Sequence, residues 1–197
     1  MERAQYHPVE NVPVNPQGCY VAADLNPQRV KVDSPAVLVM TDLSRLPAAT
    51  IGITASLAQA NQSMIHRGVR MLLVTDANRR LVGIITTTDL LGERPVLASL
   101  TSGMKRDDLR ISDVMTPIEA VDAMPLEKVL RSEVGHIVAT LKQSGRQHAI
   151  VVSKEGERHE VRGVFSVTQI ARQLGVPITG NEMAHNFAEI EAAIACL

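Results

Sequence analysis

Apolar residues recur along the chain at helix spacing and then at strand spacing, and the whole pattern occurs twice. In the first copy it predicts a helix ended by a glycine, two apolar strands joined by a polar turn, and a second helix, over about residues 54–67, 70–75, 81–85 and 87–92. The corresponding strands of the second copy fall at about 148–153 and 161–165, around a charged turn. Each copy is therefore predicted to be a β-hairpin flanked by helices.

Identical and similar residues support the internal repeat. Val39-Met40-Thr41 returns as Val114-Met115-Thr116, and Gly83-Ile84-Ile85-Thr86 is matched by Gly163-Val164-Phe165-Ser166. The separation grows from 75 residues at the first match to 80 at the second, so the second copy contains small insertions. Neither copy exceeds about 65 residues, a size at which a lone domain is marginally stable, and we therefore expect the two copies to pack together.

The repeat divides the chain into five parts. Five prolines in the first 35 residues disfavour a long helix and predict an irregular arm. The tail carries apolar residues at helical spacing, which the same chain or a partner surface must cover, namely Phe187, Ile190, Ile194 and Leu197. We predict an α+β fold with an N-terminal arm (1–35), a first repeat (36–92), a linker (93–110), a second repeat (111–175) and a C-terminal helical tail (176–197).

Composition argues against several classes of partner. With 20 basic and 21 acidic side chains the net charge is −1, which offers no electrostatic surface for nucleic acid or an anionic membrane. Aromatic side chains, on which single-strand binders stack bases, make up only 2% of the residues. The N-terminus has no hydrophobic signal segment, and Cys19 and Cys196 form no disulfide pattern, so we expect a cytoplasmic protein.

Catalytic motifs are missing from the sequence. It contains none of the zinc-protease, nucleophile-elbow, phosphate-loop, dinucleotide-binding or paired-cysteine patterns. The six histidines lack metal-ligand spacing, and the methionines fit core packing better than a cofactor site. We therefore expect neither an enzyme nor a metal site, and an active site built from unfamiliar parts is the remaining enzymatic alternative.

The sharpest chemical feature is the strand-to-helix corner over residues 83–90. Thr86 closes the strand beside the free backbone N–H groups of the next helix, which attract anions. Asp89 lies one turn further on, where a carboxylate accepts hydrogen bonds from a cis-diol such as ribose. The same Thr-x-x-Asp spacing forms a helix capping box, as does Ser166-x-x-Gln169 in the second copy. The local sequence leaves both interpretations open.

Taken together, the repeated features resemble a protein family. They are Val-Met-Thr-Pro-Ile at 114–118, a glycine-ended helix before an apolar strand, and a Gly-x-x-Thr-x-x-Asp corner before the last helix, each with a counterpart in the other copy. Their order resembles the tandem CBS-domain pair, also called a Bateman module, over residues 36–175. The resemblance implies two copies packed around a pseudo-two-fold axis, with two clefts between them.

Each cleft, by this resemblance, joins the corner of one copy to the Val-Met-Thr segment of the other. The residues so assigned to the first cleft are Arg70, Gly83, Thr86, Asp89, Met115, Thr116, Pro117 and Ile118. Arg70 stands where the family often places a phosphate-contacting residue, although a solvated charge at the strand edge is the alternative. Gly83 either lets backbone and ligand approach closely or serves only for packing.

The second cleft departs from the family pattern. Gln169 stands where the diol-binding aspartate is expected, Gln147 corresponds to Arg70, and Asp42 adds a negative charge at the position of Pro117. Losing the charged hydrogen bonds removes about 1.5–3 kcal/mol, or about one to two decades of affinity. The residues assigned to this degraded cleft are Thr41, Asp42, Gln147, Ser166 and Gln169, and we expect one competent cleft.

By resemblance, the chain is expected to be a regulatory module that senses an adenine-type nucleotide, of the AMP, ADP, ATP or S-adenosylmethionine class, in the cleft between the repeats. The nucleotide is then a regulatory ligand, and no cofactor is required. The alternative is a scaffold or dimerisation module without a ligand, favoured by the degraded cleft and the apolar tail. A homodimer and an unidentified protein effector are the expected partners.

Overall fold

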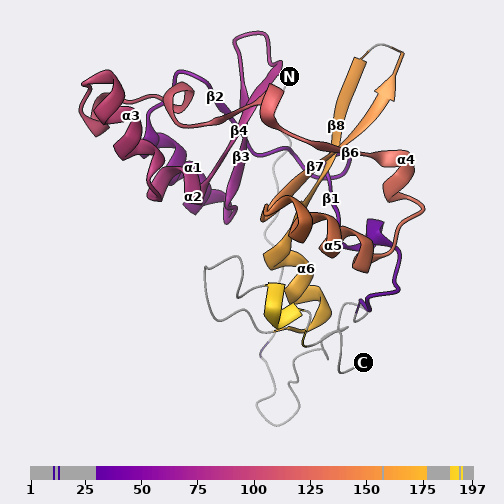
Figure 1. Ribbon diagram of the computed structural model, residues 1–197. Helices are drawn as coiled ribbons and strands as arrows, with labels where there is room; N and C mark the ends of the chain where they lie inside the picture. The colour runs from indigo at the N-terminus through magenta and orange to yellow at the C-terminus, as the bar shows by residue number, and fades with distance from the viewer. Residues whose placement is uncertain are drawn as a thin grey trace.

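The computed structural model describes residues 11, 13, 30–156, 158–176, 187–190 and 192. Within them the chain forms two halves, each with a four-stranded sheet and its own helices (Figure 1). The strand orders are β2-β3-β4-β5 in the first half and β1-β8-β7-β6 in the second. Each sheet is built on a central antiparallel hairpin, with a parallel strand at one edge and a short antiparallel strand at the other. The predicted α+β fold of two related halves is confirmed.

Both halves contain the predicted succession of helix, strand, strand and helix. In the first half these elements are α1 (Leu57–Arg67), β3 (Met71–Thr75), β4 (Leu81–Thr86) and α2 (Thr87–Leu91). In the second half they are α5 (Val134–Ser144), β7 (His148–Glu155), β8 (Arg158–Ser166) and α6 (Val167–Leu174). Helices α1 and α5 end at Gly68 and Gly145, which both have a φ of 63° that glycine adopts without steric cost.

The short antiparallel strands cross between the halves. β1 (Thr41–Asp42) precedes the first hairpin in sequence but pairs with β8, and β5 (Thr116–Pro117) pairs with β4. The parallel strands, β2 (Thr50–Gly52) and β6 (Ala123–Pro125), stay beside β3 and β7 of their own halves. Each sheet is thus completed by the segment that leads into the other repeat, and the two halves are interlocked.

Short helices accompany the crossings. They are η1 (Ala36–Val39), η3 (Ile111–Asp113), η4 (Ile118–Ala120) and α4 (Leu126–Val129). Ala36 and Val39 are fully buried in the core of the second half, whereas Leu109 and Ile111 are fully buried in the core of the first. Both predicted repeats therefore begin with a few residues that pack in the opposite half.

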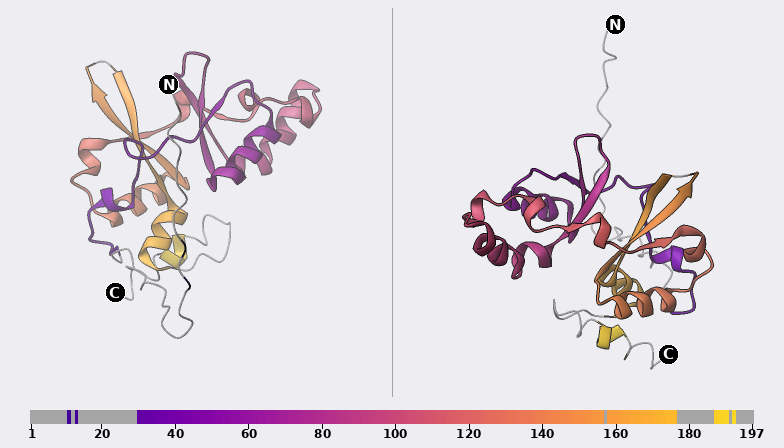
Figure 2. Two further views of the ribbon diagram at one scale, coloured as in Figure 1. Left: turned by 180° about the vertical axis from the view of Figure 1, so that it is seen from behind. Right: turned by 45° about the horizontal axis from the view of Figure 1, so that its top comes forward.

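An apolar cluster joins the two halves. It contains Met71, Leu73 and Ile84 from the first sheet and Ile150 from the second, each at most 6% exposed. Figure 2 shows the halves lying side by side in both views, with α1, α2 and α3 on the outer side of the first half. Burial of these four side chains stabilises the contact through the hydrophobic effect and places the ends of β4 and β7 close to the boundary between the halves.

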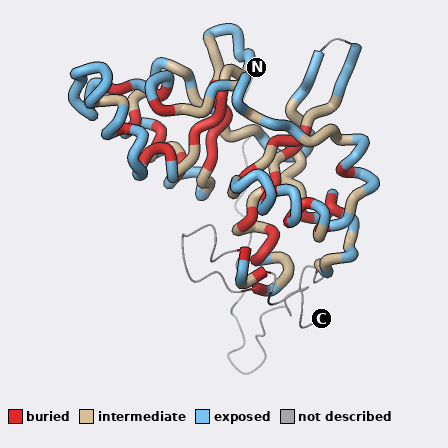
Figure 3. Tube along the Cα trace, in the orientation of Figure 1, coloured by how far each residue is buried: buried red, intermediate tan, exposed pale blue. Residues whose placement is uncertain are grey.

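The predicted linker contains a helix that the sequence interpretation did not include. Helix α3 spans Arg94–Ser102, and a single turn, η2, follows at Arg106–Asp108. Pro95 lies in the first turn of α3, where its missing N–H costs no hydrogen bond. The outer face of α3 is exposed, as Figure 3 shows, and it carries Val96, Leu97 and Leu100 at 57, 57 and 76% exposure.

The C-terminal stripe is covered by its own chain where it is described. Phe187 and Ile190 are 5% and 0% exposed and belong to the core of the second half. Ile194 and Leu197 lie outside the described residues, as does most of the predicted N-terminal arm. The described part of that arm ends at Pro35, which forms an isolated antiparallel bridge with Glu133. For Phe187 and Ile190, the alternative of a covering partner is therefore not needed.

Candidate functional site

The corner between β4 and α2 forms a complete capping box. The Oδ2 atom of Asp89 accepts hydrogen bonds from the backbone N–H and the hydroxyl of Thr86, both at 2.8 Å, and the Asp89 N–H donates to the Thr86 hydroxyl at 3.3 Å. These bonds satisfy donors that the start of a helix otherwise leaves free. The capping interpretation of Thr-x-x-Asp is confirmed, while recognition of a diol stays a prediction.

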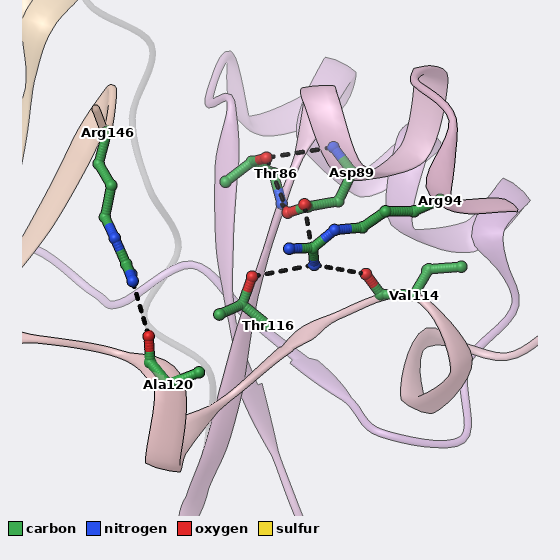
Figure 4. A network of polar contacts seen from close by, with 7 residues as sticks. All are labelled: Thr86, Asp89, Arg94, Val114, Thr116, Ala120 and Arg146. Atoms are coloured by element: carbon green, nitrogen blue, oxygen red, sulfur yellow. Dashed lines mark hydrogen bonds and ion pairs between the residues drawn. The ribbon is translucent and has the colours of Figure 1, made fainter. Parts of the chain in front are cut away.

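Arg94 binds the other oxygen of the same carboxylate. Its Nη1 atom lies 3.1 Å from Oδ1 of Asp89 and donates to the carbonyl of Val114 and the hydroxyl of Thr116, each at 3.0 Å (Figure 4). The Asp89 side chain is only 11% exposed, so this ion pair is screened less than a surface pair. Arg94 was missed by the sequence interpretation because it lay in the assumed linker, and no local pattern marks it.

A first cavity of about 630 Å³ lies between the halves beside this corner. Its lining comes from the corner, from the crossing segment after β5, and from the junction of α5 and β7: Ile84, Thr86, Thr88, Asp89, Arg94, Thr116, Ala120, Ser144, Gly145, Arg146, Gln147 and His148. Of the predicted residues, Thr86, Asp89 and Thr116 are brought together here. Met115 packs instead against the core of the first half, and Pro117 and Ile118 are not among the lining residues.

Gly83 is required by the packing of β5 on β4. A Cβ atom at this position would lie 2.5 Å from the Thr116 carbonyl oxygen and 3.0 Å from the sulfur of Met115. Gly83 and Pro117 are register partners in the sheet, so the backbones approach closely at this point. Of the two predicted roles of Gly83, the packing role is confirmed.

Arg146 contributes a second guanidinium to the first cavity. Its Nη2 atom donates to the carbonyl of Ala120 at 2.7 Å and lies 3.8 Å from Oδ2 of Asp122. The Asp122 side chain is 93% exposed, so this ion pair contributes little. Figure 4 shows Arg146 across from Arg94, and it belongs to the α5–β7 connection of the other half. Arg146 lies between Gly145, which ends α5, and strand β7. This position next to a helix-ending glycine can be recognised in the sequence, but Arg146 was not among the predicted site residues.

A second cavity of about 400 Å³ occupies the pseudo-symmetric position. It is lined by Thr41, Leu43, Leu46, Pro47, Ala49, Gly68, Val69, Arg70, Met71, Leu73, His148, Val164, Ser166, Thr168, Gln169 and Arg172. Thr41 donates to Oε1 of Gln169 at 3.1 Å, so these two predicted residues bind each other. Asp42 is not in the lining: hydrogen bonds from the hydroxyl and N–H of Ser44 hold it in a turn and lower the pKa of its carboxyl.

Arg70 and Gln147 line the opposite cavities from those predicted. Arg70 lines the second cavity with Gln169, and Gln147 lines the first with Asp89. The Arg70 carbonyl accepts a hydrogen bond from Thr87 N–H at 3.0 Å, and Gln147 binds Val167 in the same way. Each backbone therefore lies at the corner of its own half while the side chain lines the cavity at the other corner. The assignment of Arg70 to the first cleft and of Gln147 to the second, made by family resemblance, therefore differs from the cavities that the two residues line.

His148 lines both cavities and is 8% exposed. Burial lowers its pKa to about 4, and the positive charge of Arg70 acts in the same direction. The imidazole is therefore uncharged at neutral pH. Met71 is the first residue of β3 and His148 is the first residue of β7, so the two occupy equivalent positions. At the boundary of the halves, the first half therefore contributes a thioether and the second half a neutral imidazole.

No cluster of three or more histidine, cysteine, aspartate or glutamate side chains with metal-binding geometry occurs among the described residues. None of the helices described is both long enough and apolar enough to cross a bilayer.

Comparisons with known proteins agree with this architecture. The family model of the CBS domain matches residues 39–95. An uncharacterized protein of Methanopyrus kandleri is 30% identical over 74 residues, a stretch that covers 37% of this chain and 38% of that relative. The matched stretch thus spans well under half of the relative's length.

Solved structures are similar over most of the chain. A conserved protein from Pyrococcus horikoshii is 14% identical with a TM-score of 0.54, covering 77% of this chain and 99% of that one. A CBS-domain containing protein from Agrobacterium tumefaciens is 20% identical (TM-score 0.52, coverage 73% and 94%). CBSX2, solved in complex with AMP, is 20% identical (TM-score 0.51, coverage 71% and 93%). At these identities the likeness establishes the fold.

Proposed function

We infer that this chain, which matches the CBS-domain model over residues 39–95 and has the fold of CBS-domain proteins, is a non-catalytic regulatory module that binds an adenine nucleotide between its two halves. The observation that carries this proposal is the first cavity, because both halves supply polar side chains to it. Its volume of about 630 Å³ lies within the range of small-molecule sites. The similar protein CBSX2 was solved with AMP, which supports the same ligand class here.

In this proposal the first cavity receives the nucleotide. Thr88 and Thr116 offer hydroxyl groups, while Ile84 and Ala120 provide apolar surface for a base. In the second cavity a glutamine, bonded to Thr41, replaces the carboxylate. The first cavity is therefore the competent one in this account, as the sequence predicts.

Regulation follows from where the ligand lies. A nucleotide that contacts β4 and α2 on one side and the α5–β7 junction on the other binds best when both walls are in place. The difference in affinity between two arrangements of the halves is the coupling free energy available to a protein effector. No chemical conversion of the ligand is needed for this role.

A thermal-unfolding panel tests the proposal. We expect AMP, ADP or ATP to raise the unfolding temperature of the full chain, with guanine nucleotides as matched controls of equal charge. At 100 times the dissociation constant the ligand adds about 2.7 kcal/mol, which corresponds to a rise of about 5–11 °C for a chain of this size. An unchanged unfolding temperature with every adenine compound would overturn the proposal.

An assembly role is the second candidate, and a specific observation favours it. Helix α3 exposes Val96, Leu97 and Leu100 on its outer face, and Met104 just beyond its end is 40% exposed. Val96 and Leu97 lie four and three residues before Leu100, so these three residues share one side of the helix. In this proposal a second copy of the chain covers the stripe, giving the homodimer expected by resemblance.

A further inference from the structure

The first cavity carries an excess of positive charge. Its ionisable lining residues are Asp89, Arg94 and Arg146, together with His148, whose lowered pKa leaves it uncharged at neutral pH. Two guanidinium groups thus face one carboxylate. The carboxylate is also the least accessible of the three, because the Asp89 side chain is 11% exposed while Arg94 and Arg146 are 47% and 33% exposed. A ligand in this cavity meets a net positive wall.

Asp89 has little capacity left for a ligand. A carboxylate offers about four lone-pair sites. Two on Oδ2 accept the N–H and the hydroxyl of Thr86, and Oδ1 is bound to Nη1 of Arg94. One site on Oδ1 remains, so a ribose diol that donated both of its hydroxyl groups to Oδ1 would have to displace Arg94 from the carboxylate. The charge of Asp89 therefore serves first to hold the Arg94 guanidinium in place.

Both arginines keep donors for a ligand. A guanidinium has five N–H donors in a fork that matches two oxygens of one phosphate. Arg94 uses Nη1 for all three of its contacts, with Asp89, Val114 and Thr116. Arg146 uses Nη2 for its contacts with Ala120 and Asp122. The remaining nitrogen atoms have no hydrogen bond within the described part of the chain. Both residues line the first cavity, and Figure 4 shows their side chains apart from each other.

We propose that the first cavity selects ligands by their phosphate, which binds between Arg94 of the first half and Arg146 of the second. This inference rests on the proposed function and narrows its ligand class. AMP and ADP carry the required anion. Adenosine lacks it, and S-adenosylmethionine brings a positively charged sulfonium toward two guanidinium groups. The phosphate also ties the two halves together, because each arginine belongs to a different one.

Calorimetric titration of the full chain with AMP, ADP, adenosine and S-adenosylmethionine tests this selection. We expect AMP and ADP to bind at least about tenfold more tightly than adenosine, and S-adenosylmethionine to bind no better than adenosine. Arg146→Gln and Arg94→Gln are each expected to weaken AMP binding about 10- to 100-fold, and Arg146→Gln is expected to leave adenosine binding nearly unchanged. Arg131→Gln removes the same charge from an exposed position of the second half and is expected to bind AMP as the parent chain does.

The outcomes separate this inference from the proposed function. Tight binding of adenosine or S-adenosylmethionine would overturn the phosphate selection while leaving an adenine site in place. Loss of AMP binding in Arg70→Gln, but not in Arg146→Gln, would move the ligand to the second cavity and would also overturn it. Failure of every adenine compound to bind would remove both proposals. Because Arg94→Gln leaves Asp89 without its ion-pair partner, the Arg146 variant, checked by its unfolding temperature, is the deciding one.

Discussion

Asp89 stabilises the corner of the first half through both carboxylate oxygens. One oxygen caps helix α2 through Thr86, and the other holds Arg94 against the segment that crosses from the second repeat. The cap could be predicted, because Thr-x-x-Asp is a local pattern. The ion pair could not, because Arg94 reaches Asp89 only after α3 has folded back on α2. The cavities that Arg70 and Gln147 line could not be predicted from local sequence either, because they depend on how the two halves pack.

Replacing Asp89 tests these two contacts. We expect Asp89→Ala to lower the free energy of unfolding by about 1–2 kcal/mol, because the helix cap and the partner of Arg94 are both lost. Asp89→Asn keeps an acceptor for Thr86 and removes the charge, so a smaller loss is expected. Urea denaturation measures both. Equal stability of Asp89→Ala and the parent chain would contradict the described role of the carboxylate.

The buried imidazole of His148 predicts a pH dependence of stability. Its pKa of about 4 in the folded chain lies below its ordinary value of 6.5. As the pH falls from 6.5 towards 4, the unfolded chain takes up a proton that the folded chain does not, and the stability falls by up to about 3 kcal/mol. Above pH 6.5 this residue contributes no pH dependence.

The variant His148→Met isolates this effect, because the first half carries Met71 at the equivalent position. We expect the variant to keep its cavity boundary. The decline in stability that His148 causes between pH 6.5 and 4 should be absent from the variant. Chemical denaturation at several pH values gives the comparison. An identical pH profile in the variant and the parent chain would show that His148 does not titrate in this window.

Among the elements, those defined by local periodicity were predictable. Helix α1 and strands β3, β4, β7 and β8 appear where apolar spacing and turn residues indicate them. Helix α3 was not predicted, because Pro95 and the charges of residues 105–108 favour a linker. Only the structure shows that this proline lies in the first turn of a helix, where it is tolerated. The crossing of β1 and β5 is non-local, and only the resemblance to a family implied it.

The contact between β4 and β5 is tested by adding one methyl group. We expect Gly83→Ala to cost about 1–3 kcal/mol, because its Cβ atom would meet the Thr116 carbonyl at 2.5 Å and the strands would have to separate. Gly52→Ala is the matched control in the same sheet, since a Cβ atom there has nothing within 4 Å. Denaturant midpoints compare the two, and similar midpoints would mean that β5 does not lie against Gly83.

For the whole molecule, the crossing strands make the two halves one unit around two cavities. Whether copies of this unit associate is tested on the exposed stripe of α3. We expect Leu97→Lys combined with Leu100→Lys to convert a dimer into a monomer in analytical ultracentrifugation, because two charges would be buried in an apolar contact. Lys142→Glu, on an exposed position of α5, provides a control on the other half. A dimer that survives the double substitution would show that α3 is not its interface.

The central claim is that one nucleotide contacts both halves at once, and hydrogen–deuterium exchange of the full chain with and without AMP tests it most directly. The account predicts slower exchange in two separate segments, 84–89 at the β4–α2 corner and 144–148 at the α5–β7 junction, because both line the first cavity. The Arg146→Gln variant at the same AMP concentration is expected to lose the protection in both segments together. Protection confined to one half, or no protection at saturating AMP, would contradict it.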